Sequence, residues 1–242
     1  HNQNNIIASN FEEAMIQKVG GELYQLFYKG YSRKQWMIDP DQLSPEVASI
    51  IPIRMNKDNR YFTDAYQGLP VQGYSEMFYT MLDHPNIHTV LNTNYFDVKN
   101  EFPNYLTIYT GRVDQLFDYR YGKLEYHSVK FEYRRGTHKE RLPAAVINYP
   151  NDYDFIRETE YNAFSPYEFP YPVLGREYPQ KDGYPFYSIP TEKNLTLAKR
   201  YLLEVKSTFP NIMLVGRVAT YRNLNMAQCV ASVMDELSGY LF

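Results

Sequence analysis

Apolar positions in the first part of the chain recur at the spacing of an α-helix. Between residues 11 and 29 they fall three or four apart, and Ser9 and Glu12 stand where a capping box would open such a helix. Gly20 and Gly21 interrupt the run, because each glycine costs a helix about 1 kcal/mol relative to alanine. We therefore predict a helix over 11–29 that is broken at the two glycines.

Two shorter helices are predicted before the residue pattern changes from helical to strand-like. Ser44 and Pro45 combine a capping residue with a proline at the first helical position, and Pro52 should end this helix. Residues 73–82 place their apolar side chains on one side of a helix. Residues 31–43 are polar and aromatic, and we predict a loop there.

From about residue 86 the pattern changes to short runs typical of strands, followed by two further helices. Thr191 stands at the start of a strong amphipathic helix, and Asn225 stands where it would cap a last helix. In that last helix we expect five apolar residues to face inward: Val230, Val233, Met234, Leu237 and Leu241. The predicted strands are 87–92, 105–109, 129–133, 144–148, 155–161 and 211–215, with short strands inside an ordered loop region at 165–190.

Composition narrows the class of protein. With 44% hydrophobic and 22% charged residues and a net charge of −3, the 242 residues are those of a folded globular chain, not a disordered one. The missing basic surplus argues against a nucleic-acid partner. No apolar run approaches the roughly 20 residues that span a bilayer, so we expect no membrane insertion. Tyrosine, at 25 residues, outnumbers phenylalanine, which indicates surfaces lined by rings that carry hydroxyl groups.

The familiar catalytic and cofactor motifs are absent from the sequence. It has no G-x-G-x-x-G, no phosphate-binding glycine loop and no G-x-S-x-G. His84 and His88 have the helical spacing of metal ligands, but Pro85 lies between them, so we expect no metal site. Cys229, the single cysteine, is predicted to be an inert thiol. The residues by themselves predict an aromatic-rich α+β protein without a complete catalytic constellation.

Residues 27–36, Phe-Tyr-Lys-Gly-Tyr-Ser-Arg-Lys-Gln-Trp, closely resemble a signature of the UDP-galactopyranose mutase family, whose members carry K-G-Y-T-x-K-Q-W. Further matches follow in the family's order, so that the resemblance covers the chain from about 11 to 240. They lie at 59–62, 66–70, 84–87, 109–111, 117–122, 145–150, 157–160, 185–187 and 216–222.

The resemblance implies a fold with a helical domain, a twisted antiparallel sheet and a Rossmann-like FAD domain. Residues 1–85 would be helical, with a mobile loop at 36–52; 86–114 would add strands to the FAD domain. Residues 115–190 would form the antiparallel sheet, and 191–242 would return as helix, strand and helix to an incomplete FAD domain. The strand, glycine-rich turn and helix that hold the FAD pyrophosphate are not within the sequence. We therefore expect this chain alone not to hold FAD tightly and to be inactive by itself. A flavin absorption spectrum of the purified protein would test the first expectation.

The resemblance also implies an activity. Family members are flavoenzymes that interconvert UDP-galactopyranose and UDP-galactofuranose through a covalent adduct between reduced flavin and sugar. The expected cofactor is FAD and the expected partners are the two UDP-sugars, with a homodimer of the full protein as one possibility and the cytoplasm as the location. Two other interpretations stay open: a non-catalytic or degenerate nucleotide-sugar-binding domain, and a related flavoprotein that acts on another UDP-sugar.

Site residues follow from the resemblance position by position. The uracil-packing positions are Phe27, Tyr28, Tyr31 and Ser32, where Ser32 replaces the usual threonine. The remaining substrate positions are Trp36 near the sugar, Tyr61 and Arg157 at the diphosphate, Asn148, and Tyr187 between diphosphate and flavin; Arg157 and Tyr187 are the catalytic candidates. The flavin positions are Thr110, Gly111, Arg217, Asn225 and Met226. Core packing is the alternative for Phe27 and Trp36, and a structural ion pair is the alternative for Arg157.

The sequence departs from the family pattern at four positions. Ile50 replaces an arginine of the mobile loop, and Asn223 replaces a second diphosphate tyrosine. Asn225 stands for an acidic residue and Arg112 for a proline. An arginine and a hydroxyl lost from a phosphate clamp remove hydrogen bonds of about 1.5–3 kcal/mol each. The arginines that could substitute for the one missing at position 50 are Arg54, Arg60 and Arg222.

Overall fold

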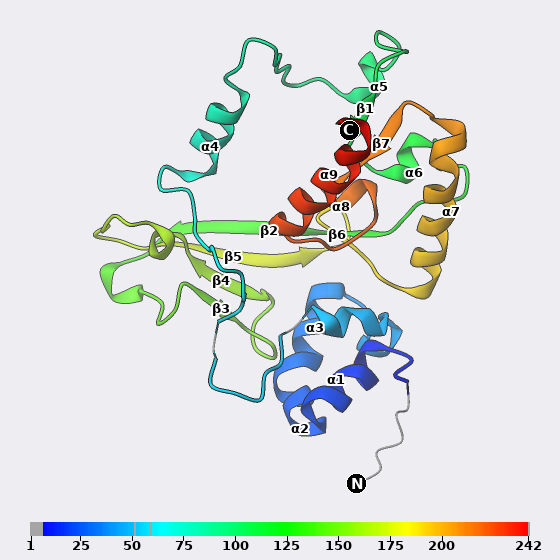
Figure 1. Cartoon of the computed structure of the whole chain (residues 1–242). Helices are drawn as coiled ribbons and strands as arrows, with labels where there is room; N and C mark the ends of the chain where they lie inside the picture. The colour runs from blue at the N-terminus through cyan, green and yellow to red at the C-terminus, as the bar shows by residue number, and fades with distance from the viewer. Residues whose placement is uncertain (1–6, 51, 59, 242) are drawn as a thin grey trace.

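The computed structural model describes residues 7–50, 52–58 and 60–241 (Figure 1). In chain order it shows a helical segment, an extended arm that carries one exposed helix, a five-stranded antiparallel sheet and a C-terminal α/β part. Residues 1–6, 51 and 59 of the predicted helical part, and residue 242 of the predicted C-terminal part, lie outside the described residues.

The helical segment contains α1 (Phe11–Val19), α2 (Gly21–Leu23), the π-helix η1 (Tyr24–Lys29) and α3 (Gly30–Trp36). The predicted break occurs at Gly20, whose φ of 82° lies in the left-handed region that favours glycine. The predicted cap was one residue early. Asn10 caps α1 by accepting from the Glu13 N–H over 2.9 Å, while Ser9 bonds to the Glu13 carboxylate.

Residues 31–36 continue the helix, so the predicted loop 31–43 was wrong over its first half. The helix ends where Met37 takes a left-handed conformation with φ 51°. Burial explains the difference, because Trp36 is only 7% exposed and packs in one apolar core with Phe11, Met15 and Leu43. The chain then forms the 3-10 helices η2 (Pro40–Gln42) and η3 (Pro45–Ser49), the second of which starts at Ser44 as predicted.

The extended arm joins the helical segment to the rest of the chain (Figure 1). It carries α4 (Gly73–Leu82), which confirms the predicted helix, and the short helix α5 (Tyr95–Val98). The strand predicted at 87–92 was wrong: these residues are exposed and form no ladder with any described strand. A β-prone run becomes a strand only where a second strand lies beside it to pair with.

The antiparallel sheet has the strand order β3-β4-β5-β2-β6. Its strands are β2 (Tyr126–Arg135), β3 (Val146–Asn148), β4 (Arg157–Glu160), β5 (Val173–Gln180) and β6 (Tyr187–Ser188). The 3-10 helices η4 (His138–Glu140) and η5 (Tyr161–Phe164) lie in its connections. In the register of the sheet, Arg157 lies opposite Glu177 and His127 lies opposite Tyr187. These two pairings position the candidate site.

The C-terminal part is built around two parallel strands, β1 (Thr107–Tyr109) and β7 (Ile212–Leu214). Around them lie the helices α6 (Val113–Leu116), α7 (Glu192–Thr208), α8 (Gly216–Ala219) and α9 (Met226–Leu241). Thr191 caps α7 as predicted, by accepting from the Asn194 N–H. Asn225 caps α9 as predicted, because its side chain accepts from the Gln228 N–H over 2.8 Å. This mixture of helices and a curled antiparallel sheet confirms the predicted α+β fold.

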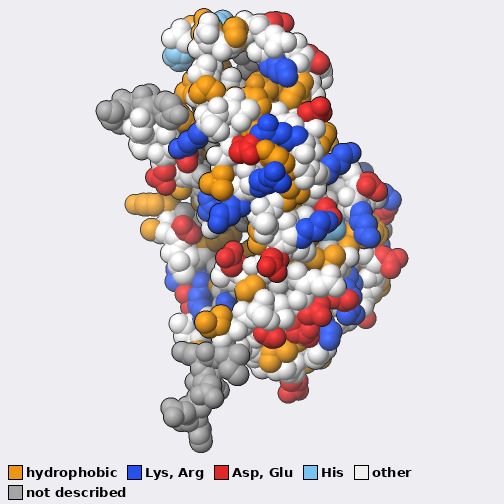
Figure 2. Space-filling model, turned by 90° about the vertical axis from the view of Figure 1, so that its right-hand side faces the viewer, with side chains coloured by type: hydrophobic (Ala, Val, Ile, Leu, Met, Phe, Trp, Pro, Cys, Tyr) orange, Lys and Arg blue, Asp and Glu red, His pale blue; other side chains and the backbone are white. Residues whose placement is uncertain are grey.

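The apolar face of α9 was predicted to point inward, which was wrong for Val230 and Met234, whereas Val233 and Leu237 are half-buried. Val230 and Met234 are 63% and 67% exposed. Figure 2 shows a face of the molecule on which both signs of charge are interspersed with apolar side chains. Among the residues that the structure describes, no helix combines the length and the apolar character needed to cross a bilayer.

Tyrosine hydroxyls fasten the C-terminal part to the start of the sheet. Tyr126 donates to the carbonyl of Val218 over 3.1 Å, and Tyr221 donates to the carbonyls of Glu125 and Ile189. These bonds hold α8 next to β6, and they account for part of the tyrosine excess as core rings with satisfied hydroxyls.

Candidate functional site

Arg157, the first residue of β4, joins three other elements. Its Nη2 donates to the hydroxyl of Tyr31 on α3 over 2.8 Å, and its Nε donates to Oδ1 of Asn148 on β3 over 3.1 Å. Its Nη1 lies 3.6 Å from the carboxylate of Glu177 on β5. The structure therefore brings together Tyr31, Asn148 and Arg157, three of the predicted substrate-binding residues.

The charges around Arg157 are set by burial and by this pairing. Burial opposes the charged guanidinium, but Tyr31 and Glu177 outweigh it and hold the Arg157 pKa above its usual value. Burial raises the pKa of the Tyr31 hydroxyl, although Arg157 acts against the shift. Burial also raises the pKa of Glu177, again against the effect of Arg157. The site thus presents a permanent cation beside a neutral phenol.

Tyr187 on β6 lies between two other predicted residues. The Trp36 indole meets its ring edge to face, with centroids 6.3 Å apart and an interplanar angle of 76°. The guanidinium carbon of Arg217 lies 5.0 Å from the centre of the same ring. Tyr187 is also near enough to Tyr31 and Arg157 that a negative charge on its hydroxyl would raise the pKa of both. Residues from α3, the sheet and α8 therefore form one continuous group.

Several polar atoms are buried without a hydrogen-bond partner among the described residues, and two of them concern the candidate ligand site. They are Nε of Arg217, a donor, and Oδ1 of Asn223, an acceptor. The Asn223 amide is held in place because its Nδ2 donates to the carbonyl of Ser188 over 2.9 Å. A buried hydrogen bond left unmade costs about 1–3 kcal/mol. A ligand with an acceptor for Arg217 and a donor for Asn223 would complete both bonds.

The predicted flavin-binding residues lie around the carboxyl ends of the parallel strands. Thr110 and Gly111 directly follow β1, and Arg217 follows β7, its parallel neighbour. Ligands of open α/β sheets bind at this edge. A Cβ on Gly111 would come within 2.6 Å of the Tyr109 hydroxyl, so a larger residue would displace that ring. The buried free donor of Arg217 fits a flavin, whose ring carries carbonyl oxygens and nitrogens as acceptors.

The last two flavin candidates open α9, which packs against α8. Met226 is 65% exposed, and its N–H belongs to the first helical turn, which has no intrahelical acceptor. The Asn225 side chain is engaged in capping α9. The structure therefore leaves the backbone of Met226 for a ligand and assigns the Asn225 side chain a structural bond.

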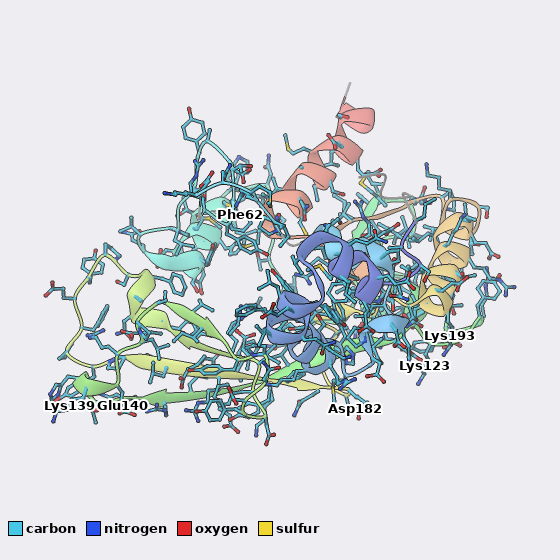
Figure 3. The ribbon with its side chains drawn as sticks, turned by 90° about the horizontal axis from the view of Figure 1, so that it is seen from below. Phe62, Lys123, Lys139, Glu140, Asp182 and Lys193 are labelled. Atoms are coloured by element: carbon cyan, nitrogen blue, oxygen red, sulfur yellow. The ribbon has the colours of Figure 1, made fainter. Side chains whose placement is uncertain are left out.

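The other predicted substrate-binding residues do not all lie beside Arg157 and Tyr187. Phe27 lies one turn before Tyr31 and is 57% exposed, whereas Tyr28 packs against the helical core and Ser32 is buried. Tyr61 is 60% exposed and packs edge to face on Phe62, which Figure 3 labels on the arm. In the part of the chain that the structure describes, no hydrogen bond or ring contact joins Tyr61 to Arg157 or Tyr187.

The arginines that could substitute at Ile50 are engaged elsewhere or exposed. Arg60 pairs with Asp58 over 2.8 Å, and Arg54 donates to the Arg60 carbonyl over 2.5 Å. Arg222 is exposed beside α9, and Ile50 is itself 51% exposed.

Arg112, the residue in place of the family proline, has a structural role. Its guanidinium makes two hydrogen bonds, of 2.7 and 3.1 Å, to the fully buried carboxylate of Asp114. It also donates to the carbonyl of Leu124 over 3.1 Å. Arg112 therefore joins the turn after β1 to the segment that leads into β2.

Lys34 was not identified from the sequence, yet it holds α3 against the loop between β3 and β4. Its ammonium group donates to the carbonyls of Tyr149 and Asp152, each over 2.6 Å. On the same helix face, Gly30 approaches the loop so closely that a Cβ would lie 2.4 Å from the Pro150 carbonyl oxygen. This docking sets the distance between Tyr31 on α3 and the Asn148–Arg157 pair.

Glu177 and His127 were missed as well, and only the strand register could have indicated them. Each lies directly opposite a predicted site residue, Arg157 and Tyr187 respectively. A sequence without a known register does not reveal such cross-strand neighbours.

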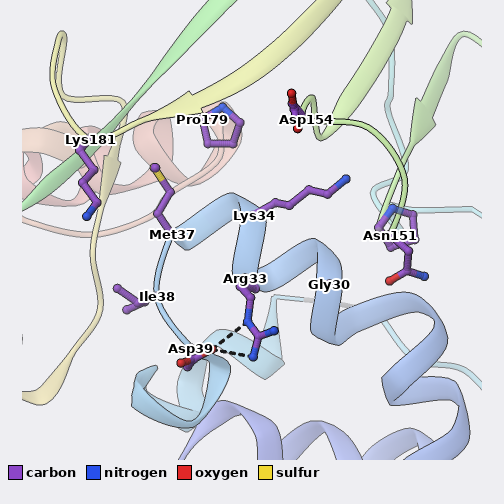
Figure 4. A pocket seen from close by; sticks show the side chains of 11 residues that line it. Gly30, Arg33, Lys34, Met37, Ile38, Asp39, Asn151, Asp154, Pro179 and Lys181 are labelled. Carbon is purple, nitrogen blue, oxygen red and sulfur yellow. Dashed lines mark hydrogen bonds and ion pairs between the residues drawn. The ribbon is translucent and has the colours of Figure 1, made fainter.

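An open pocket of about 670 Å³ lies on the face of α3 that carries Gly30, Arg33, Lys34 and Met37 (Figure 4). Its charged groups are already engaged for the most part. Arg33 pairs with Asp39 over 2.7 Å, and Lys34 bonds to the loop carbonyls. Tyr31 and Trp36 do not line this pocket, so it is separate from the group around Arg157 and Tyr187.

Comparison with known proteins gives concordant matches. The family model described as UDP-galactopyranose mutase matches residues 26–223. A probable UDP-galactopyranose mutase of Klebsiella pneumoniae is 34% identical over 238 residues, which cover 96% of this chain and 61% of that protein. A dTDP-fucopyranose mutase of Escherichia coli is 30% identical, covering 93% of this chain and 62% of the relative. The UDP-galactopyranose mutase of Mycoplasma pneumoniae is 33% identical, covering 87% and 58%.

A solved structure agrees at the level of the fold. The crystal structure of a reduced UDP-galactopyranose mutase superposes with a TM-score of 0.63 and 16% identity, over 89% of this chain and 65% of that one. The chain thus spans about three fifths of the length of the curated relatives that it matches.

Proposed function

This chain belongs to the UDP-galactopyranose mutase family, and on that premise we propose that it carries the nucleotide-sugar site of an enzyme that interconverts UDP-galactopyranose and UDP-galactofuranose. The observation that carries the proposal is the placement of Arg157. Its guanidinium donates hydrogen bonds to Tyr31 and Asn148, and it lies near enough to Tyr187 for that hydroxyl to affect the Arg157 pKa. Arginine suits a diphosphate because its planar fork of donors matches phosphate oxygens.

The surrounding residues suggest how the substrate would lie. Tyr31 and the exposed ring of Phe27 offer flat faces for the uracil. In this arrangement the sugar would lie on the Arg217 side of Trp36 and Tyr187, between the diphosphate and the cofactor. Trp36 itself is only 7% exposed and packs in the core of the helical segment, as the core-packing alternative predicted. Arg157 would stabilise the negative charge that develops on UDP as the bond between sugar and phosphate breaks.

We propose FAD as the cofactor, held in this chain by Arg217, the Met226 backbone, Thr110 and Gly111. The buried free Nε of Arg217 supports this assignment, because it needs an acceptor such as a flavin ring supplies. In its reduced form, a bound flavin supplies the nucleophile for the anomeric carbon. The chain's own residues orient the sugar, exclude water and retain the released UDP. The substrate class favours a cytoplasmic location, and a homodimer of the full protein stays a prediction.

Isothermal titration calorimetry of this chain with UDP and with UDP-galactose tests the proposal. Both should bind, and Arg157→Gln should weaken both alike, because the two ligands share the diphosphate. Arg120→Gln is the matched control, since the ion pair of Arg120 is with Glu204 on α7, outside the sheet that carries Arg157. If the folded chain binds neither ligand, it does not carry the nucleotide-sugar site.

A second candidate, a mutase for another nucleotide sugar, is favoured by Asn223. Its buried Oδ1 is an acceptor that phosphate oxygens cannot satisfy, so it would require a donor such as a sugar hydroxyl. The 30% identity to a dTDP-fucopyranose mutase points the same way. Competition between UDP-galactose and a dTDP-linked 6-deoxyhexose would decide between the two ligands.

The non-catalytic alternative is tested by turnover. The chain is incubated with UDP-galactofuranose and chemically reduced FAD, and the products are separated chromatographically. Formation of UDP-galactopyranose that depends on Arg157 would exclude a purely binding role.

A further inference from the structure

His127 connects the single tryptophan of the chain to the sheet. It is the second residue of β2, is 3% exposed, and its Nε2 is hydrogen-bonded to the carbonyl oxygen of Trp36, the last residue of α3. Its cross-strand partner is Tyr187, whose ring packs edge to face on the Trp36 indole. Two neighbours in the sheet therefore hold the same residue, one by its backbone and the other by its ring.

The hydrogen bond fixes the state of the imidazole. A carbonyl oxygen only accepts, so Nε2 carries the proton that it donates to Trp36. The other ring nitrogen, Nδ1, is buried and has no hydrogen-bond partner among the described residues. A second proton would bury a positive charge, and the carbonyl of Gln180, which favours that charge, does not offset the cost of burial.

The charged groups that act on the imidazole lie beside its own strand and the neighbouring strand. Lys181, which follows β5, disfavours a second proton, whereas Glu125, which precedes β2, favours it. On α3, Arg33 pairs with Asp39 and Lys34 bonds to loop carbonyls, and both line the pocket of Figure 4. Burial outweighs the favourable carbonyls of Trp36 and Gln180, so the pKa of His127 lies below its ordinary value.

We propose that His127 is a positioning residue for Trp36: the neutral imidazole holds the end of α3 and the indole against Tyr187, and protonation of the imidazole releases them. The release follows because the imidazolium gains hydration only by leaving its buried position, which breaks the bond to the Trp36 carbonyl. The consequence for ligand binding rests on the proposed function, in which the sugar would lie on the Arg217 side of Trp36.

The direction of the pH effect follows from linkage. The docked state has the lower pKa, so docking has its full stability above the ordinary histidine pKa of about 6.5. That stability is lost as the pH falls through the lowered pKa of the docked state. Acidification should therefore expose Trp36 while the rest of the fold persists.

Trp36 is the only tryptophan, so intrinsic fluorescence reports on this one position. Excitation beyond the tyrosine absorption is combined with acrylamide quenching while the pH is lowered from about 8 to about 5, a range that spans the titration of histidine. The wild-type chain should shift its emission to longer wavelength and become more quenchable below about pH 6.5, with unchanged far-UV circular dichroism. No ligand is needed, so the result does not depend on whether UDP binds.

Three variants separate positioning from general stability. His127→Gln keeps an N–H donor for the Trp36 carbonyl but does not titrate, so its emission should match neutral wild type at every pH. His127→Phe should show the shifted emission throughout; if it does not fold, the glutamine variant still decides the question. His138→Gln changes an exposed histidine on η4 and should keep the wild-type profile. A transition that persists in His127→Gln, or a wild-type emission that does not change with pH, would overturn the proposal.

Discussion

The guanidinium of Arg157 lies 2.8 Å from the hydroxyl of Tyr31, although the two residues are 126 positions apart in the chain. This bond ties the last α-helix of the helical segment to an inner strand of the sheet. A donor suited to phosphate and a ring suited to a base are thereby fixed relative to each other before any ligand arrives. Such preorganisation lowers the cost of binding, because fewer groups must be ordered.

Replacing Arg157 by lysine should show whether charge or geometry matters. Lysine keeps the positive charge but loses the fork that contacts Tyr31, Asn148 and Glu177 at once. We expect UDP affinity to fall by about 10-fold or more, since each charge-assisted bond contributes about 1.5–3 kcal/mol. Calorimetric titration measures the change, and Arg120→Lys, at an arginine that pairs with Glu204 on α7, should leave the affinity unchanged. Equal affinity in Arg157→Lys would refute the bidentate contact.

Gly30→Ala should weaken the docking of α3. The added Cβ would lie 2.4 Å from the Pro150 carbonyl oxygen and 2.5 Å from Oδ1 of Asn151, so the helix or the loop must move. Because Tyr31 is the next residue, UDP affinity should fall along with the melting temperature. Gly21→Ala is the matched control, since nothing lies within 4 Å of its Cβ position. That substitution should stabilise the chain by up to about 1 kcal/mol.

Arg112→Ala should destabilise the C-terminal part. It leaves the fully buried carboxylate of Asp114 without its cation, at a cost of about 1.5–3 kcal/mol. Urea denaturation measures this as a lower midpoint at constant slope. Arg60→Ala removes an exposed pair with Asp58 and should produce no measurable change. Comparable effects of the two substitutions would mean that burial is not what gives the Arg112 pair its strength.

The exposed apolar stripe of α9 should drive self-association of this chain. Met226, Val230 and Met234 are spaced four residues apart and are all more than 60% exposed. Light scattering should show oligomers that grow with concentration, and the double variant Val230→Glu with Met234→Glu should suppress them. Leu203→Glu alters a single exposed leucine on α7 and should leave the association intact. A monomeric wild-type chain at high concentration would contradict this prediction.

Local signals predicted the helices well. The break at Gly20, the bounds of α4 and the caps of α7 and α9 all agree with the sequence analysis. Each depends on bonds between residues three or four apart, which any chain with these residues can form. The same signals misplaced the strand at 87–92 and part of the inward face of α9, because pairing and burial depend on what lies beside the segment.

The sequence predicted only some of the residues that the structure brings together at the candidate site. The resemblance indicated Tyr31, Asn148, Arg157 and Tyr187, and the structure joins these residues through bonds and electrostatic contacts. It assigned no role to Lys34, although that residue lies in the family signature, and none to His127 or Glu177; the partners of these three residues are backbone carbonyls or cross-strand neighbours. Such partners are set by strand register and helix docking, which leave no local pattern in the sequence.

By itself, the sequence determined the α+β class, the extent of α4, the caps of α7 and α9, and the family to which the chain is similar. Only the tertiary structure decided that Trp36 ends a buried helix, that His127 holds its carbonyl, and that Arg157 lies between Tyr31 and Glu177. The reason is physical. Local hydrogen bonds follow from neighbouring residue types, whereas long-range contacts form only once strands have paired and helices have packed in a single register.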